Sequence, residues 1–184
     1  MHKPLNQLFS TTLCRSTQTG DELATELTAW GVHFVTGGGL VVQPKLPSTA
    51  LLAELALSDE ARLRLALIPL LLKRPDFSGF VYASAEILPP TARINLQCYY
   101  TAAQLLQRKF SARLQHLLGQ QAALPDLFTK ELALQPCATV DEQLYNLAKR
   151  QAELSGEEIN WLGTYEHAVQ RFMLHLEKQK LWRQ

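Results

Sequence analysis

Amphipathic helical periodicity dominates the chain, and three of its periodic segments begin with the four-residue pattern of a capping box. The boxes start at Thr19, Thr139 and Ser155, and each has a glutamate three residues later. In such a box the hydroxyl and the glutamate carboxylate each accept a hydrogen bond from a backbone N–H that the helix leaves free. Apolar residues then recur at helical spacing after each box. We therefore predict that a helix begins just after each of these three residues, and that the first one stops at Gly31.

Prolines punctuate the middle of the chain. Residues 58–60 (Ser-Asp-Glu) predict the start of a further helix, which Pro69 should kink or restart and Pro75 should end. After a Pro-Pro pair, the pattern predicts one long helix over Thr91–Leu118, closed by a glycine. A short helix over residues 124–134 is expected to follow.

One segment near the N-terminus has strand-like rather than helical character. The β-rich runs 32–35 and 40–42 are separated by three glycines, which predicts a small β-hairpin. We thus expect a mainly α fold, an antiparallel bundle of about five to seven helices with one small β-hairpin near the N-terminus. Residues 1–47 would form an N-terminal segment with a helix and the hairpin, and residues 48–184 a helical domain.

The segment from Gly31 to Val42 reads GVHFVTGGGLVV and resembles the opening strand and turn of minimal nucleotidyltransferases. The resemblance implies a metal-dependent transferase, and such enzymes hold their metal with a nearby pair of aspartates. The next acidic residues here are Glu54, Asp59 and Glu60, which lack that paired spacing. We therefore interpret the glycines as a plain hairpin turn.

Composition narrows the class of protein. Hydrophobic residues make up 47% of the 184, enough for a substantial core. The three cysteines are widely spaced and odd in number, which argues against a disulfide framework and favours a reducing compartment. The N-terminus has no secretory apolar region, and the longest apolar run, residues 65–72, is too short to span a bilayer. We expect a cytoplasmic protein that does not enter the membrane.

Catalytic motifs are missing from the sequence. The three glycines are not followed by Gly-Lys-Ser/Thr, and no dinucleotide fingerprint, zinc-ligand spacing or G-x-S-x-G elbow occurs. Cys98 falls on an apolar helix face, where cysteine usually acts as a small hydrophobe. We therefore expect no cofactor and no metal site, and consider an enzyme less consistent with the sequence than a non-enzymatic protein.

The charge distribution is uneven although the net charge is only +1. Residues 61–125 contain eight Arg and Lys but two acidic residues, a net of +6, so the remainder carries −5. Winding the long helix at 100° per residue gives an apolar seam along its whole length, formed by Tyr99, Ala103, Leu106, Phe110, Leu114 and Leu117. An adjoining line is apolar from Ile94 to Leu105 and then continues as Lys109, Arg113 and His116.

This line of cations is the candidate binding site, together with Arg108, which lies about 100° away. Arg108 shares its own face with polar residues, namely Gln97, Thr101, Gln104 and Gln115. Cations bordering a core seam could bind a phosphate, a nucleic-acid backbone or an acidic partner. They could equally complement the helix macrodipole, cover apolar surface with their stems, or pair with distant carboxylates.

Three functional hypotheses follow. The first is a non-enzymatic interaction or regulatory protein that presents helical surfaces to a protein partner or to a second copy of itself. The second is a nucleic-acid-binding regulator that uses the basic middle region. The third is an enzyme or sensor that binds a small anionic ligand at Lys109, Arg113 and His116. Trp161, Met173 and Trp182 of the last helix could add an exposed docking patch, although aromatic residues at helical spacing more often belong to the core.

Overall fold

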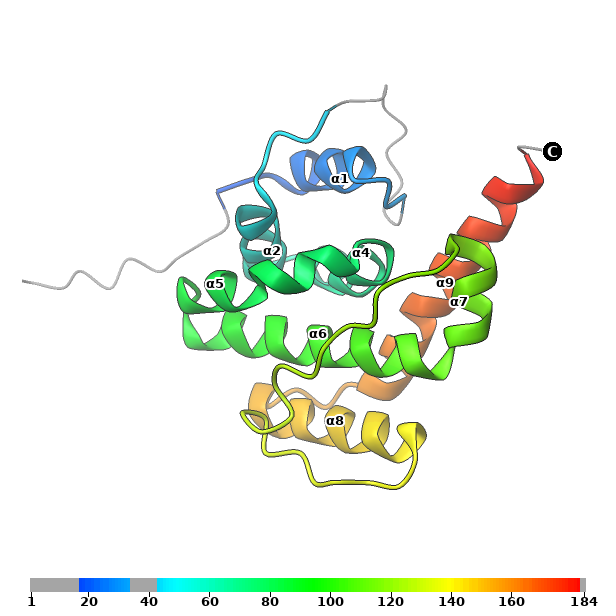
Figure 1. Ribbon diagram of the computed structural model, residues 1–184. Helices are drawn as coiled ribbons and strands as arrows, with labels where there is room; N and C mark the ends of the chain where they lie inside the picture. The colour runs from blue at the N-terminus through cyan, green and yellow to red at the C-terminus, as the bar shows by residue number, and fades with distance from the viewer. Residues whose placement is uncertain (1–16, 34–42, 183–184) are drawn as a thin grey trace, which may run out of the picture.

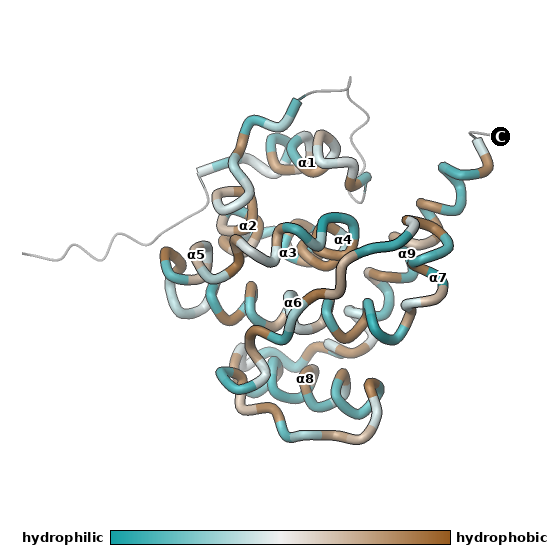
Figure 2. Tube along the Cα trace, in the orientation of Figure 1, coloured by the Kyte–Doolittle hydropathy of each residue, from teal (hydrophilic) through white to brown (hydrophobic). Residues whose placement is uncertain are grey.

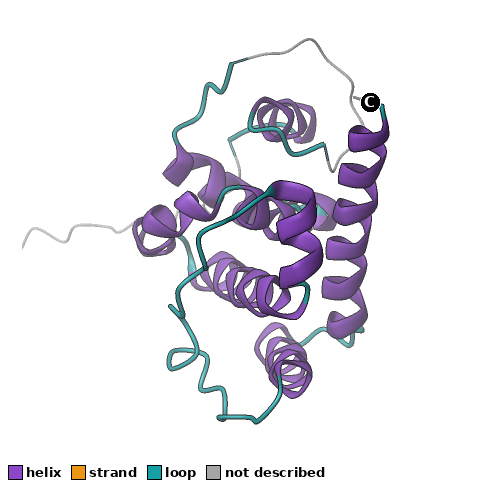
Figure 3. Cartoon of the chain, turned by 45° about the vertical axis from the view of Figure 1, so that its right-hand side comes forward, coloured by secondary structure: helices purple, strands orange, loops and turns teal. Residues whose placement is uncertain are grey.

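The described part of the protein is built from helices joined by loops. The computed structural model describes residues 17–33 and 43–182 (Figures 1 and 3). The elements in chain order are α1 (Gly20–Ala29), α2 (Ser48–Leu57), α3 (Ala61–Leu65), α4 (Leu67–Lys73), the 3-10 helix η1 (Pro75–Phe80), α5 (Val81–Glu86), α6 (Pro90–Lys109), α7 (Ser111–Leu118), α8 (Val140–Ser155) and α9 (Trp161–Leu181). The predicted mainly α fold is confirmed, whereas the antiparallel bundle topology stays a prediction.

The predicted hairpin lies for the most part outside the described residues, since these leave out residues 34–42. Val32 and His33 are described, and neither is in a strand; no strand occurs within residues 17–33 and 43–182. The described part of the predicted N-terminal segment packs α1 into the common core through Leu23 and Leu27. The division at residue 47 stays a prediction.

Helix α6 occupies the centre of the fold and packs against neighbours on several sides. It contacts α2, α3, α4, α5, α8 and α9. Tyr100, Leu96 and Leu106 are completely buried along it, as the wide apolar surface of this segment predicts. Hydrophobic residues recur along the helices around α6, while hydrophilic residues alternate with them on α8 and α9 (Figure 2).

Two of the three predicted capping boxes are present. The Thr19 hydroxyl accepts a hydrogen bond from Glu22 N, and the Glu22 carboxylate accepts one from Thr19 N at 2.7 Å. Thr139 and Glu142 repeat this arrangement at the start of α8. Both boxes lie at helix starts with no competing signal nearby, so a short-range pattern was sufficient to place them.

The third predicted box, at Ser155, is wrong. Ser155 is the last residue of α8, which ends because Gly156 takes the left-handed conformation with φ 69°. Glycine adopts this conformation without steric cost, so it favours a helix end over a helix start at this point. Asn160 caps α9 instead, its side-chain oxygen accepting a hydrogen bond from Gly163 N at 3.0 Å.

Helix interruptions occur both where proline predicts one and where it does not. Pro69 lacks the backbone N–H that would continue the preceding turn, and the helix restarts close to it, with α3 ending at Leu65 and α4 beginning at Leu67. The single long helix predicted over Thr91–Leu118 is instead divided at Phe110, whose φ and ψ are −107° and 23°. This break turns α7 away from the axis of α6 so that α7 packs against α9 (Figure 1).

The chain between α7 and α8, residues 119–139, forms a long connection that crosses α6 (Figure 1). The helix predicted over residues 124–134 is wrong, because only one turn forms there, with Leu132 N donating to Phe128 O at 2.8 Å. Leu124, Phe128 and Leu132 are buried, and their four-residue spacing resembles a helical pattern although the backbone between them is irregular. Side chains of the surrounding helices hold the connection: Tyr82 Oη donates to Leu127 O, Tyr100 Oη to Pro125 O, and Arg150 Nε to Leu132 O.

An aromatic cluster attaches α1 to α4 and η1. The ring of Trp30 meets the ring of Phe77 edge-on, with centroids 4.9 Å apart. The Arg74 guanidinium lies 4.7 Å from the centroid of Trp30 and 5.3 Å from that of Phe77. Phe77 is completely buried at the middle of this cluster.

A buried polar contact joins α8 to α9. Tyr165 Oη donates a hydrogen bond to Gln151 Oε1, and both residues are fully buried. The Gln151 Nε2 and the Trp161 indole N–H are buried without a hydrogen-bond partner among the described residues. Tyr99 of α6 packs against Trp161 and Tyr165 at ring distances of 6.4 and 6.3 Å.

Candidate functional site

The predicted line of cations does exist, but it faces carboxylates of the same chain. Lys109 Nζ lies 2.6 Å from Asp141 Oδ1 and 2.7 Å from Glu166 Oε1. Hydrogen bonds to Asp141 and then to Glu166 raise the pKa of Lys109 above its ordinary value. Arg113 Nη2 lies 2.7 Å from Glu177 Oε1. The carboxylates thus balance the positive charges of Lys109 and Arg113.

His116 completes the line without adding an open anion site. Lys180 of α9 donates to the carbonyl oxygen of His116 at 3.2 Å, and its Nζ lies 3.4 Å from His116 Nε2. Lys109, Arg113 and His116 therefore hold the end of α6 and α7 against α8 and α9. Anion binding by these three residues stays a prediction, and the geometry does not favour it. Nor do they supply an unpaired basic strip for nucleic acid.

Arg108 has a different environment because it lies on the polar face of α6. Gln97, Thr101, Gln104 and Arg108 follow one another at spacings of four, three and four residues, so they form one stripe along the helix. The first three are buried, with Thr101 only 2% exposed. The 119–139 connection covers them, and Gln97 Nε2 donates to Glu131 Oε2 within it at 2.6 Å. Polar side chains at helical spacing are thus enclosed by the fold.

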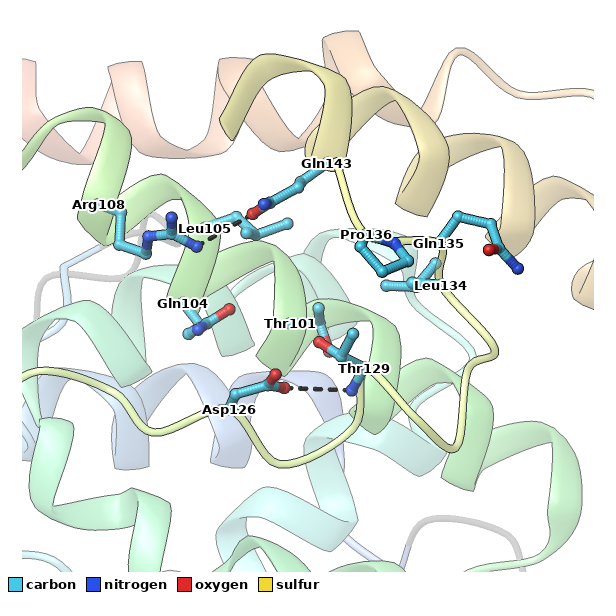
Figure 4. Close-up of a pocket in the computed structure, with 10 residues that line it drawn as sticks. All are labelled: Thr101, Gln104, Leu105, Arg108, Asp126, Thr129, Leu134, Gln135, Pro136 and Gln143. Carbon is cyan, nitrogen blue, oxygen red and sulfur yellow. Dashed lines mark hydrogen bonds between the residues drawn. The ribbon is translucent and has the colours of Figure 1, made fainter. Parts of the chain in front are cut away.

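A pocket of about 120 Å³ lies between this stripe, the connection and the start of α8 (Figure 4). We call it the α6 pocket; its lining residues are Thr101, Gln104, Leu105, Arg108, Asp126, Thr129, Leu134, Gln135, Pro136 and Gln143. Water in the liquid occupies about 30 Å³ per molecule, so the space corresponds to roughly four water-sized groups. It can hold a small molecule.

Gln104 is the most informative residue of the α6 pocket. Its side chain is 9% exposed, and its amide has no hydrogen-bond partner among the residues that the structure describes. The amide lies toward the space between Arg108 and Asp126 (Figure 4). The amide is not among the fully enclosed polar groups that lack a partner in the described residues, so it remains accessible from the pocket. A bound molecule can therefore hydrogen bond to Gln104.

Two opposite charges flank the amide, and neither has an ion-pair partner in residues 17–33 and 43–182. Arg108 Nη1 donates to Gln143 Oε1 at 3.0 Å, which leaves its other N–H groups available. Asp126 Oδ1 accepts from Thr129 N at 3.2 Å, which leaves Oδ2 available. The Gln143 amide is itself fixed, since its Nε2 donates to Cys137 O at 3.0 Å. The pocket thus offers donors on one side and an anionic acceptor on the other.

Further side chains fix the walls of the α6 pocket. The Gln107 amide donates to Ala122 O at 2.9 Å and accepts from Leu124 N at 2.8 Å, so it binds the connection as a neighbouring backbone strand would. A second, more open hollow of about 320 Å³ is lined by Gln107 and shares Arg108 with the α6 pocket. Arg108 can therefore be reached from two sides.

Other reactive groups do not form a second site. Burial raises the pKa of the Cys98 thiol to about 12, so this cysteine stays protonated at neutral pH. Residues 17–33 and 43–182 contain no group of three or more His, Cys, Asp and Glu side chains that could hold a metal ion. No helix in those ranges combines the length and apolarity needed to cross a membrane.

The sequence placed Arg108, Gln104 and Thr101 on one face, but it did not indicate that this face lines a pocket. Asp126, Thr129 and Gln143 were missed because they come from a connection and a helix that reach α6 only after folding. The one available signal was the run of polar residues at helical spacing on a helix otherwise expected to be buried. No protein-family model matches the chain, and no curated protein or solved structure shows significant similarity to it.

Proposed function

We propose that this protein is a binding protein that holds a small polar molecule in the α6 pocket. The observation that carries the proposal is the amide of Gln104, which lines the α6 pocket and makes no hydrogen bond to a described residue, although Gln104 as a whole is only 9% exposed. Small-molecule sites typically combine apolar walls with a few convergent polar groups. Here Leu105, Leu134 and Pro136 supply apolar wall.

In this proposal the binding cation is Arg108, which lies on a different face of the predicted long helix from Lys109 and Arg113. Among the three, only Arg108 forms no ion pair with a carboxylate of the described chain. The ligand would be held by the helix α6 on one side and by the 119–139 connection on the other. A protein of this kind senses or carries its ligand, and no reaction on the ligand is required.

Thermal unfolding in the presence of small polar metabolites tests this function. The wild-type melting temperature is expected to rise with at least one class of amino acids, carboxylates, carboxamides or short polyols, since a ligand that binds only the folded state stabilises it. Gln104→Leu keeps a similar side-chain volume but removes both hydrogen-bonding groups, so the rise should disappear. The variant alone should be about as stable as the wild type, because the Gln104 amide makes no hydrogen bond to a described residue that the substitution would break.

Gln170→Leu, at an exposed position of α9, is the matched control and should keep the full response. The proposal fails if no compound stabilises the wild type, or if Gln104→Leu responds as the wild type does. The second outcome would place the ligand elsewhere.

A specific observation also supports a protein partner for the end of α9. Trp182 is 86% exposed and Leu181 69%, and Leu174 lies one heptad before Leu181 on the same helix side. The last turns of α9 extend beyond the other helices (Figure 1) and carry Lys178 and Lys180. A partner helix with apolar residues and acidic flanks would complement this surface, whereas a second copy would place like charges together.

Charge and shape complementarity can be tested on this surface directly. Affinity capture from the native cell should recover an acidic protein at a constant ratio with the wild type. Replacing both Leu181 and Trp182 by serine should abolish recovery, since exposed apolar anchors dominate such contacts. Tyr145→Ser, on α8 and similarly exposed, should leave recovery unchanged. Equal recovery with all three proteins, or a dimer of this chain alone, would refute the acidic partner.

A further inference from the structure

We infer that the ligand of the α6 pocket is a small zwitterion of the α-amino acid type, with its carboxylate on Arg108 and its ammonium group on Asp126. The inference rests on the proposed function and specifies its ligand. It follows from charge, from hydrogen-bonding geometry and from the size of the pocket.

Charge sets the first constraint. Among the residues that the structure describes, only Arg108 and Asp126 line the α6 pocket with a charge, and their charges are opposite. A ligand with a single negative charge would satisfy Arg108 but would also meet Asp126, while a cation would meet the reverse problem. A dianion such as phosphate fits still less well. A ligand with both charges pairs with both residues.

The arrangement of the hydrogen-bonding groups sets the second constraint. Gln104 lies between Arg108 and Asp126 in the pocket (Figure 4), and its amide both donates and accepts. It can therefore bind beside either end of a zwitterion, donating to the carboxylate or accepting from the ammonium group. The Gln143 oxygen keeps the Arg108 guanidinium directed along the pocket, and the Thr129 backbone N–H does the same for the Asp126 carboxylate.

Size sets the third constraint. A space of about 120 Å³ is too small to enclose a nucleotide, a sugar phosphate or a long peptide, so a ligand held wholly inside it must be small. The apolar side chains of Leu105, Leu134 and Pro136 leave room for a short aliphatic or hydroxylated side chain beside the charged groups. Glycine, alanine, serine and threonine are the natural compounds that combine these properties.

Calorimetry and thermal unfolding with matched probes test the inference. L-Alanine and L-serine are expected to bind, and at 10 to 100 times their Kd to raise the melting temperature by about 3–10 °C. Propionate lacks the ammonium group and propylamine lacks the carboxylate, so each should bind at least tenfold more weakly. Acetamide reports binding to Gln104 alone.

Charge-neutral variants assign the two ends of the ligand. Arg108→Gln and Asp126→Asn should each weaken L-alanine binding at least tenfold, and Arg108→Gln should no longer discriminate propylamine from L-alanine. Arg62→Gln removes an exposed arginine that pairs with Glu60 and should change nothing. Binding of acetamide or propionate but not of amino acids would overturn this inference while leaving the proposed function intact. If none of the probes, nor any other small polar compound, binds, the proposed function fails as well.

Discussion

Phe77→Ala is expected to lower the free energy of unfolding by about 3–5 kcal/mol, the usual cost of removing a buried aromatic ring. Phe77 is completely buried, and its ring supports Trp30 from α1 and the Arg74 guanidinium together. Folded proteins of this size have only about 5–15 kcal/mol of stability in total. The loss should therefore appear as a clear fall in the urea midpoint, followed by far-UV circular dichroism.

Phe80 provides the matched control for this substitution. Its ring packs on that of Phe77 at 6.3 Å, but the residue is 43% exposed. Phe80→Ala should cost no more than about 1–2 kcal/mol, because much of its surface is already in water. Comparable losses in the two variants would mean that the cluster does not depend on Phe77 as its buried centre.

The buried pair of Gln151 and Tyr165 is expected to show strong non-additivity. Tyr165→Phe should cost about 1–3 kcal/mol, since it leaves Gln151 Oε1 unpaired beside an Nε2 that already lacks a partner. Gln151→Met should cost a similar amount, because it leaves the buried Tyr165 hydroxyl without its acceptor. The double variant removes the donor, the acceptor and the unsatisfied Nε2 together.

We therefore expect the double variant to be as stable as the wild type, or more stable. The coupling free energy from a double-mutant cycle should then equal the sum of the two single losses, about 2–6 kcal/mol. Equilibrium unfolding in urea of the wild type, the two single variants and the double variant gives the four free energies of unfolding that the cycle needs. If the double variant loses the sum of the two single losses in unfolding free energy, Tyr165 and Gln151 do not form the hydrogen bond that the structure shows.

Local sequence signals predicted the helix starts well where nothing competed with them. The Thr19 and Thr139 boxes each satisfy two backbone N–H groups within four residues, so no distant contact is needed to form them. Thr19 and Ser155 are both followed by a glycine, but only Ser155 directly continues a preceding helix, and there Gly156 ends that helix in the left-handed conformation. Two local signals overlapped there, and the sequence alone did not rank them.

The other differences arise from tertiary contacts. The break at Phe110 allows α7 to pack on α9, a helix that begins some fifty residues later in the chain. Asp141 and Glu166, the acidic partners of Lys109, are likewise 32 and 57 residues away, and the partner of Arg113 is 64 residues away. Periodicity along one segment carries no information about such partners, so it identified the cations but left their role open.

The candidate site shows the same limit. The polar stripe of α6 was visible as a face shared by Arg108 and several glutamines, yet its burial depends on a connection that the sequence suggested to be partly helical. Because the apolar residues of that connection recur every four positions, the pattern concealed an irregular segment. That the 119–139 connection forms a wall of the α6 pocket becomes visible only in the folded structure.

The way in which the 119–139 connection is attached has a consequence for how a ligand reaches Gln104. Besides its buried residues Leu124, Phe128 and Leu132, the connection is held to α5, α6 and α8 by single side-chain hydrogen bonds to its backbone, and it has few regular backbone hydrogen bonds of its own. Segments of this type open in local fluctuations whose free energy is well below that of global unfolding. The helices can therefore stay folded while one wall of the α6 pocket exchanges between closed and open states. Binding would then slow the exchange of this wall, and ligand affinity and local stability would be linked quantities.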